Sequence, residues 1–361
     1  MTALIPSRIR RLASLAEALL TPHGTDRYLE LVDPMLVRRE VRGLVTAVRR
    51  QTPDSVTLTV QPSRAWPGFA AGQYVRMQIE IDGVRRTRCY SPCGSQYDGE
   101  LEFTVKEQGL VSGHLNREIG VGQVVGLSTP DGTFTLPATR PERLLLVSGG
   151  SGVTPVLAMA RTLAAENHPG EIVFLHYSNG PADVLYRTEL AELAARHPGL
   201  RVVHAYTHAK SGGDLRGFFS AEHLEKVAPW YRDAQTYVCG PQPLMDAVRT
   251  LFDAEQLGER VHTEEFTAPV LTFDTENAEG QVRFARSGRE CANSGKTLLE
   301  QAEEAGLTPE HGCRMGICFS CTQLKTAGRT RNAKTGEVSG EENEEIQLCI
   351  SVPAGDVEID A

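Results

Sequence analysis

The segment HGCRMGICFSC, residues 311–321, spaces three cysteines as C-x4-C-x2-C, and a fourth, Cys349, follows near the C-terminus. A [2Fe-2S] cluster requires four thiolates, two for each iron, and this spacing can supply them. From the residues alone, a zinc site and free thiols stay open as alternatives. Structural zinc favours paired C-x2-C knuckles, however, and only Cys318 and Cys321 form such a pair. We therefore predict that the iron ligands are Cys313, Cys318, Cys321 and Cys349.

The residues around these cysteines have the pattern of a small mixed domain. Gln281–Arg286 and Val357–Ile359 alternate as strands do, and Thr297–Gly306 is typical of a short amphipathic helix that ends in glycine. This part of the chain resembles plant-type ferredoxins, and the resemblance implies a β-grasp (α+β) fold for a domain at residues 267–361. The polar stretch Lys325–Glu345 departs from that pattern, and we expect it to be a solvent-facing loop.

Residues 139–266 alternate predicted strands with predicted helices, which indicates an α/β domain with a parallel sheet. Leu144–Pro155 is a buried strand, a glycine-rich turn and a helix start, and such a helix start is suited to a pyrophosphate. Thr236–Met245 is another strand, which ends in Cys-Gly-Pro before a helix. Ligands bind at the carboxyl ends of parallel strands, so these two turns predict a site for a pyrophosphate-bearing ligand, although the glycine-rich turn could be purely structural. The predicted contacts are Gly149, Gly150, Ser151, Gly152, Thr154, Gly240 and Pro241.

Residues 40–138 are rich in strands separated by glycine and proline turns, which predicts an antiparallel β-barrel. The expected strands are Val41–Val48, Ser55–Val60, Tyr74–Ile81, Leu101–Lys106 and Gln123–Ser128.

Two short motifs in this barrel suggest a cofactor. Arg88–Ser91 reads R-x-Y-S, and Gly109–Leu115 starts a helix whose N–H groups suit a phosphate. Together with the two turns of residues 139–266, and in this order along the chain, these motifs resemble the ferredoxin–NADP reductase superfamily. The resemblance implies that residues 40–138 bind FAD, although some relatives use FMN, and that the chain is an NAD(P)H-dependent oxidoreductase.

The resemblance also implies roles for single residues. Arg88 would pair with a flavin phosphate, Tyr90 would pack on the isoalloxazine ring, and the Ser91 hydroxyl would hydrogen-bond flavin N5. Phe266 would cover the ring, and the alternative for it and for Glu264 is that they only begin the linker to the next domain. The other predicted flavin contacts are Lys106, Gly109, Val111 and Ser112.

On the nucleotide side, Cys239 would face the nicotinamide and Glu264 would lie near it, so Ser91, Cys239 and Glu264 form the predicted catalytic set. A small buried core cysteine is the alternative for Cys239. We expect Ser178 and Arg187 to contact the adenosine end. NADPH is expected over NADH, because no acid at Ser178 or Asn179 awaits the ribose 2′-hydroxyl.

Residues 1–39 form an N-terminal extension, predicted to be helical from the spacing of its apolar residues. Its basic helix could pack on the barrel or touch an anionic membrane surface. The stretch Tyr28–Pro34 and the order of the domains are similar to those of bacterial reductases that serve membrane fatty-acid desaturases.

Composition narrows the class of protein. The net charge of -9 argues against nucleic-acid binding, and we find neither a membrane-length apolar run nor a secretory leader. We therefore expect a cytoplasmic monomer, with peripheral contact to the inner membrane through its acceptor or its N-terminal helix as an option.

These patterns predict one electron path. NAD(P)H would reduce the flavin, and electrons would then pass singly through the [2Fe-2S] cluster to a partner protein. The expected partner is a membrane di-iron acyl-chain (fatty acyl-CoA) desaturase, and the alternative is an oxygenase or hydroxylase component. A redox-sensing iron–sulfur protein is a further alternative, but it would not need Ser91, Cys239 and the glycine-rich turn together. We expect the partner to dock on an acidic face that holds Glu341, Glu342, Glu344 and Glu345.

Overall fold

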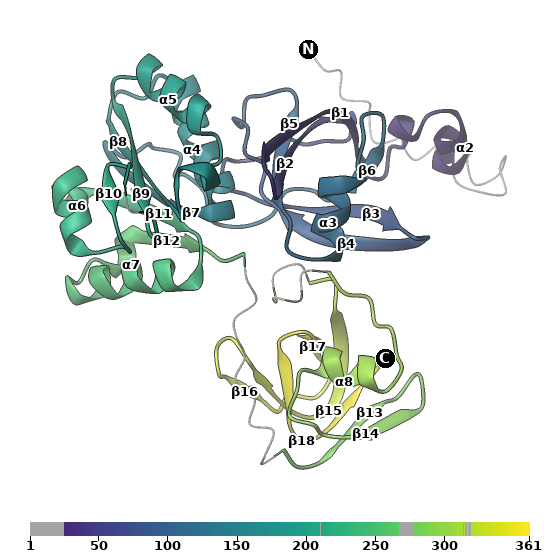
Figure 1. Cartoon of the computed structure of the whole chain (residues 1–361). Helices are drawn as coiled ribbons and strands as arrows, with labels where there is room; N and C mark the ends of the chain where they lie inside the picture. The colour runs from purple at the N-terminus through teal and green to yellow at the C-terminus, as the bar shows by residue number, and fades with distance from the viewer. Residues whose placement is uncertain (1–24, 210, 267–277, 313, 315, 317–318) are drawn as a thin grey trace.

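The computed structural model describes residues 25–209, 211–266, 278–312, 314, 316 and 319–361, and their strands form three separate sheets (Figure 1). The predicted fold class is confirmed: an antiparallel barrel-like domain, a parallel-sheet domain and a C-terminal domain of mixed sheet follow one another along the chain. The barrel and the parallel-sheet domain lie side by side, and the C-terminal domain lies below them in the view of Figure 1.

The barrel is an antiparallel sheet with the strand order β4-β3-β6-β1-β2-β5. Its elements are β1 Val41–Thr52, β2 Ser55–Pro62, β3 Val75–Ile81, β4 Val84–Tyr90, β5 Leu101–Lys106, helix α3 Leu110–Arg117 and β6 Val124–Leu127. Alternating apolar side chains fill the interior, where Val45, Leu58 and Phe103 are fully buried. Strand β4 was not among the expected strands, and it carries Arg88 and Tyr90 along the edge of the sheet.

The parallel-sheet domain has the strand order β10-β9-β8-β7-β11-β12. Its strands are β7 Arg143–Gly149, β8 Glu171–Ser178, β9 Leu200–Tyr206, β10 Leu215–Arg216, β11 Gln235–Cys239 and β12 Val261–Glu264. Its α-helices are α4 Val153–Ala165, α5 Arg187–Arg196, α6 Ala221–Val227 and α7 Gln242–Ala254. The central strand β7 is apolar on both faces because helices cover both sides of the sheet. The predicted glycine-rich turn therefore lies at the carboxyl end of the most deeply buried strand.

Within its described residues, the C-terminal domain is a mixed sheet with the order β14-β13-β18-β15-β16 and one helix, and β17 pairs with β15. Its elements are β13 Gln281–Phe284, β14 Arg289–Ala292, α8 Leu298–Glu304, β15 Thr322–Asn332, β16 Val338–Ser339, β17 Glu344–Gln347 and β18 Ser351–Ile359. The parallel pairing of β13 with β18, between antiparallel neighbours, fits the β-grasp arrangement that the resemblance implied.

The prediction of a solvent-facing loop at Lys325–Glu345 is wrong. The segment contains β16 and parts of β15 and β17, and Lys325 lies directly opposite Glu344 in the ladder of β15 and β17. The Lys325 side chain is fully buried, and its Nζ donates a hydrogen bond to Glu344 Oε2 at 2.7 Å. The polar composition of the segment hid its strands, because a lysine can be buried when a carboxylate pairs with it, as the half-buried Glu344 does here.

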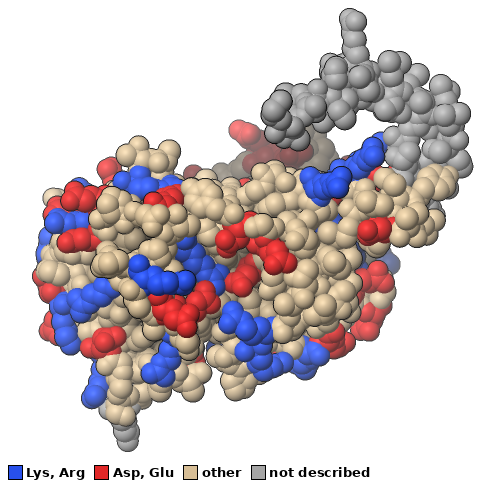
Figure 2. Space-filling view, turned by 90° about the horizontal axis from the view of Figure 1, so that it is seen from above, with Lys and Arg blue, Asp and Glu red and all other residues tan. Residues whose placement is uncertain are grey.

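The N-terminal extension is described only from residue 25, so the predicted helix before that residue lies outside the described residues. Helix α2 Thr25–Val32 precedes a 3-10 helix, Pro34–Leu36, and Leu31 and Val32 are 83% and 80% exposed. Across the described ranges, no helix combines the length and the apolarity that crossing a membrane would take. Seen from above, basic and acidic side chains are interspersed over the face of the barrel and the parallel-sheet domain (Figure 2).

Helix α4 lies where the barrel meets the parallel sheet (Figure 1). One core cluster joins its residues Val156, Met159 and Leu163 with Phe134 and Leu136 from the end of the barrel region. The two domains therefore share apolar packing, and the site described next lies along the same boundary.

Candidate functional site

A pocket of about 350 Å³ opens between the barrel and the carboxyl end of the parallel sheet. Such a volume lies within the range of small-molecule sites. Its lining residues are Tyr74, Arg88, Cys89, Tyr90, Ser91, Thr104, Val105, Lys106, Gln108, Gly109, Leu110, Val111, Ser112, Ser151, Thr154, Glu264, Glu265 and Phe266. The structure thus brings all the predicted flavin contacts to one pocket, together with two residues of the glycine-rich turn and helix start.

Ser91 and Glu264 connect the two domains within this pocket. The buried Ser91 hydroxyl follows β4 and donates a hydrogen bond of 3.4 Å to Oε2 of Glu264, the last residue of β12. Burial raises the pKa of the Glu264 carboxyl to about 8, and the hydrogen bond from Ser91 opposes that rise. Near neutral pH the pocket therefore holds a carboxyl group that can gain or lose a proton.

Cys239 is the neighbour of Glu264 in the parallel sheet. The two residues are register partners on β11 and β12, and Cys239 is also paired in register with Ser148 on β7. The thiol is fully buried, and this burial, followed by the charge of Glu264, raises the pKa of the thiol. Glu264 lines the pocket, whereas Cys239 is not among the described residues that line it.

The two predicted turns pack directly against each other. A Cβ on Gly152 would lie 2.3 Å from the carbonyl oxygen of Cys239, and one on Gly149 would lie 2.8 Å from Pro241. Gly150 has φ +54°, which favours glycine. Larger residues here would force the turns apart. A backbone that approaches a pyrophosphate closely also needs residues without side chains, so the glycines of this turn fit the predicted nucleotide site.

Helix α3 forms another wall of the pocket with its first turn. The Ser112 hydroxyl accepts hydrogen bonds from the N–H groups of Gln108 and Gly109 and donates one to the Gly109 carbonyl. It therefore helps to shape the helix start, whose first N–H groups have no partners within the helix. Lys106 adds a cation to the same wall, and its Nζ lies 3.3 Å from Oδ2 of Asp54. The N–H groups and the cation are a donor set that suits a phosphate, so this wall fits the flavin.

Arg88 has a contact that the sequence did not suggest. It lines the pocket, and its Nη1 donates hydrogen bonds to the carbonyl oxygens of Thr87, at 2.7 Å, and Gly312, at 2.9 Å. Gly312 immediately precedes the predicted ligand Cys313. Arg88 thus reaches from the pocket to the segment of the cysteine motif, while its predicted pairing with a flavin phosphate stays a prediction.

Ser178 and Arg187 lie away from the pocket. Ser178 is buried at the end of β8, and its hydroxyl donates to the carbonyl oxygen of Gly180. Arg187 is exposed at the start of α5. Their predicted contact with the adenosine end of the nucleotide therefore stays a prediction.

Two of the four predicted iron ligands, Cys313 and Cys318, lie outside the described residues. Cys321 and Cys349 are both buried in the core of the C-terminal domain. The backbone N–H of Gly316 donates to the sulfur of Cys349 at 3.3 Å. Backbone N–H groups aimed at cysteine sulfur stabilise thiolate ligands, so this contact fits the predicted cluster.

Sequence reasoning missed several residues of the pocket, including Tyr74, Thr104 and Gln108. Tyr74 directly precedes β3, Thr104 lies on β5 and Gln108 precedes α3, and their chemistry is common and gives no signal of its own. It also missed the polar contacts that join the domains, because these depend on residues far apart along the chain.

Comparison with known proteins agrees with this geometry. Residues 46–136 match the family described as oxidoreductase FAD-binding domain, residues 146–250 match oxidoreductase NAD-binding domain, and residues 282–354 match 2Fe-2S iron-sulfur cluster binding domain. The chain is 36% identical to an NADPH oxidoreductase of Mycobacterium tuberculosis, over 97% of this chain and 92% of that protein. It is 33% identical to a glycine betaine monooxygenase reductase subunit of Pseudomonas aeruginosa, over 81% of this chain and 87% of that one.

Among solved structures, phthalate dioxygenase reductase has the same fold, with a TM-score of 0.62 and 24% identity over 89% of this chain and 97% of that one. The cofactors are therefore FAD, a [2Fe-2S] cluster and NAD(P)H, and electrons pass from NAD(P)H through FAD to the cluster. The chain belongs to the ferredoxin–NADP reductase superfamily, in the group of oxidoreductases that carry a C-terminal [2Fe-2S] domain.

Proposed function

We propose that this reductase delivers single electrons from its cluster to the terminal component of a separate oxygenase. The observation that carries the proposal is the agreement of its three domains with relatives named as reductase subunits of glycine betaine monooxygenase and of 3-ketosteroid-9-alpha-monooxygenase. The desaturase expected from the sequence has no counterpart among the names of these relatives, so the oxygenase, first held as the alternative, becomes the leading candidate.

A membrane di-iron desaturase stays a second candidate because of the N-terminal extension. The M. tuberculosis relative aligns over 97% of the chain and is not named for an oxygenase, whereas the monooxygenase reductases align over 81% and 88%. The stretch Tyr28–Pro34 lies in that extension, with Leu31 and Val32 exposed on α2.

Reconstitution separates the two candidates. The purified holoenzyme and NADPH are combined with a terminal oxygenase from the same genome, or with a desaturase from that genome in lipid vesicles. We expect substrate-dependent NADPH oxidation and product formation with the oxygenase. If product forms with the desaturase and none forms with the oxygenase, the proposal is overturned in favour of the second candidate.

We propose that the hydride passes at the pocket, where Ser91 and Glu264 meet. The flavin, when bound there, accepts a hydride and releases its electrons singly. Ser91 would orient the ring at N5, with Tyr90 and Phe266 against it, and Cys239, beside Glu264 in the sheet, would face the nicotinamide. In a Ser91→Ala variant that retains FAD, flavin reduction should slow by on the order of 10²-fold. An unchanged stopped-flow rate would remove Ser91 from the reaction.

We further propose that NADPH is preferred. Position 178 is a serine and position 179 an asparagine, so neither of these residues presents a carboxylate to a 2′-phosphate, and Arg187 is exposed at the start of α5. A relative is named NADPH oxidoreductase. The value of kcat/KM should be higher with NADPH than with NADH, and Arg187→Gln should reduce the difference. A higher kcat/KM with NADH would reverse the assignment.

The partner would dock on the C-terminal domain beside the cluster. A groove of about 750 Å³ there is lined by Phe319, which is 60% exposed, and by the carboxylates of Glu337, Glu341 and Glu345. Glu344 cannot serve as a free docking charge, because it is paired with the buried Lys325. Replacing Glu337, Glu341 and Glu345 by Gln should slow electron transfer to the partner at low salt and flatten its salt dependence, while ferricyanide reduction stays unchanged. Equal transfer rates at every ionic strength would place the docking surface elsewhere.

A further inference from the structure

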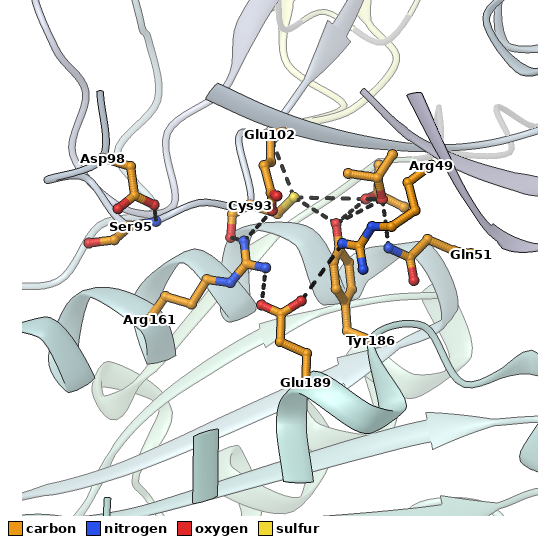
Figure 3. A network of polar contacts seen from close by, with 11 residues as sticks. Arg49, Gln51, Cys93, Ser95, Asp98, Glu102, Arg161, Tyr186 and Glu189 are labelled. Atoms are coloured by element: carbon orange, nitrogen blue, oxygen red, sulfur yellow. Dashed lines mark hydrogen bonds and ion pairs between the residues drawn. The ribbon is translucent and has the colours of Figure 1, made fainter. Parts of the chain in front are cut away.

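A buried polar network crosses the boundary between the barrel and the parallel-sheet domain (Figure 3). Its centre is Arg161 of α4, whose side chain is only 13% exposed. Nη1 of Arg161 donates to the Cys93 carbonyl oxygen at 2.6 Å and to Glu102 Oε2 at 2.7 Å, both in the barrel region. Nη2 pairs with Glu189 of α5. One guanidinium group thus joins carboxylates of two domains.

Tyr186 is the second element of this network, and it projects from the parallel-sheet domain into the barrel region. Its hydroxyl lies 3.0 Å from the Cys93 sulfur and 3.1 Å from the Thr57 hydroxyl, and it also contacts the Thr104 hydroxyl. The side chain is 3% exposed, and the Arg161 guanidinium lies 5.2 Å from the centre of its ring. A tyrosine hydroxyl from one domain is therefore fully enclosed by polar groups of the other.

The backbone of Tyr186 is also unusual. Its φ is +58°, in the left-handed region that residues other than glycine seldom occupy. A strained conformation of this kind persists where the surroundings fix it. Here the surroundings are the buried hydrogen bonds to the barrel.

These contacts act on the segment that carries Ser91. Cys93 follows Ser91 by two residues, and the Cys93 N–H donates to the Glu102 carbonyl at 2.8 Å. Arg161 and Tyr186 therefore both contact Cys93, in the short segment after β4 from which Ser91 reaches Glu264.

The same helix also carries the nucleotide turn. Helix α4 starts at Val153, directly after the glycine-rich turn, and Arg161 lies about 12 Å further along its axis. The helix thus connects the turn that would hold the pyrophosphate with the contacts that hold the flavin side of the pocket.

We propose that Arg161 and Tyr186 are positioning residues for hydride transfer, because they fix the distance between the nucleotide turn and the Ser91 segment. The hydride leaves the nicotinamide with its electron pair and reduces the flavin, so the rate depends steeply on the gap between the rings. A displacement of about 1 Å can cost on the order of 10²-fold in rate. Neither Arg161 nor Tyr186 lines the pocket, so the proposed role is an indirect one, exercised through the segment that carries Ser91.

Tyr186→Phe tests the proposal with little change in volume. Tyr231→Phe is its matched control, because Tyr231 is also fully buried and its hydroxyl donates to Glu255 at 2.7 Å, but within the parallel-sheet domain. Both variants are loaded with FAD and compared by melting temperature, by affinity for NADP⁺, and by stopped-flow reduction with NADPH carrying hydrogen or deuterium at the transferred position.

The Tyr186→Phe protein should reduce its flavin between about 10-fold and 100-fold more slowly at saturating NADPH, with a full primary isotope effect and an NADP⁺ affinity close to wild type. Tyr231→Phe should lower the melting temperature only. A merely structural network would give both variants the same pattern, with a lower melting temperature and a normal rate of reduction, and that result would overturn the proposal.

Arg161→Lys gives a second, independent test. Lysine keeps the charge but carries its three N–H donors on one nitrogen, so it loses the two separate nitrogens with which Arg161 reaches Glu102 and Glu189. The rate of flavin reduction should fall in the protein that retains FAD, and it should fall less in Arg161→Lys than in Arg161→Gln. Wild-type rates in both variants would remove Arg161 from the positioning role.

Discussion

The titration of Glu264 should set the pH dependence of flavin reduction. Its pKa is raised to about 8 by burial, so the carboxyl is neutral below that pH and charged above it. For a group with this pKa, about one-tenth is ionised at pH 7 and about nine-tenths at pH 9. As the hydride leaves, positive charge develops on the nicotinamide, and a carboxylate in the same pocket stabilises it. The rate of flavin reduction at saturating NADPH should therefore rise up to about tenfold between pH 7 and pH 9, in proportion to the ionised fraction.

The assay is stopped-flow reduction of the flavin across this range, in wild type and in Glu264→Gln. The glutamine variant cannot ionise, so its rate should be low and independent of pH. Glu265→Gln is the matched control, because Glu265 lines the same pocket but its carboxylate is paired with Arg249 at 3.0 Å. This control should retain the rise. A flat wild-type profile, or a Glu264→Gln variant that still shows the rise, would refute the reasoning.

Three further predictions concern the C-terminal domain. Cys321→Ser should abolish the cluster's visible absorption and cytochrome c reduction but spare ferricyanide reduction, which the flavin can perform directly; loss of both activities in protein that retains FAD would contradict this. Glu344→Gln should lower the free energy of unfolding of the domain by about 3 kcal/mol, because it leaves the buried Lys325 without its counter-ion. The measurement is a urea titration followed by release of the cluster, in which Glu345→Gln should have little effect. Arg88→Met should slow cluster reduction more than flavin reduction, since it removes the bond to the Gly312 carbonyl, and equal slowing of the two steps would argue for a role at the flavin alone.

Sequence alone could predict what depends on short stretches of chain. The glycine-rich turn and the Cys-Gly-Pro turn can be recognised from the sequence, because the backbone of Gly152 lies so close to Cys239 that a side chain would not fit there. The pocket contacts around Ser91 follow from a similar local motif. From these motifs the fold, the cofactors and most of the pocket residues could be predicted.

Contacts between distant residues could not be predicted in this way. The alternation of β15 is masked by Lys325, whose burial depends on Glu344, a residue on another strand. Arg161 and Tyr186 have no local motif, because each acquires its role from partners in the other domain. Arg88 had a local motif, but its bond to Gly312 joins parts of the chain that the sequence gives no reason to bring together.

The insertion of Tyr186 into the barrel has a consequence for building chimaeric reductases. Thr57, Cys93 and Thr104 form a socket for a side chain that another domain supplies, so the two domains are matched parts. A parallel-sheet domain taken from another reductase to change the choice of nucleotide would need a side chain that fits this socket as Tyr186 does. Without such a side chain, a hybrid that folds and binds both cofactors should still transfer hydride slowly. Changing the socket residues to fit the side chain of the new domain should restore the rate of hydride transfer.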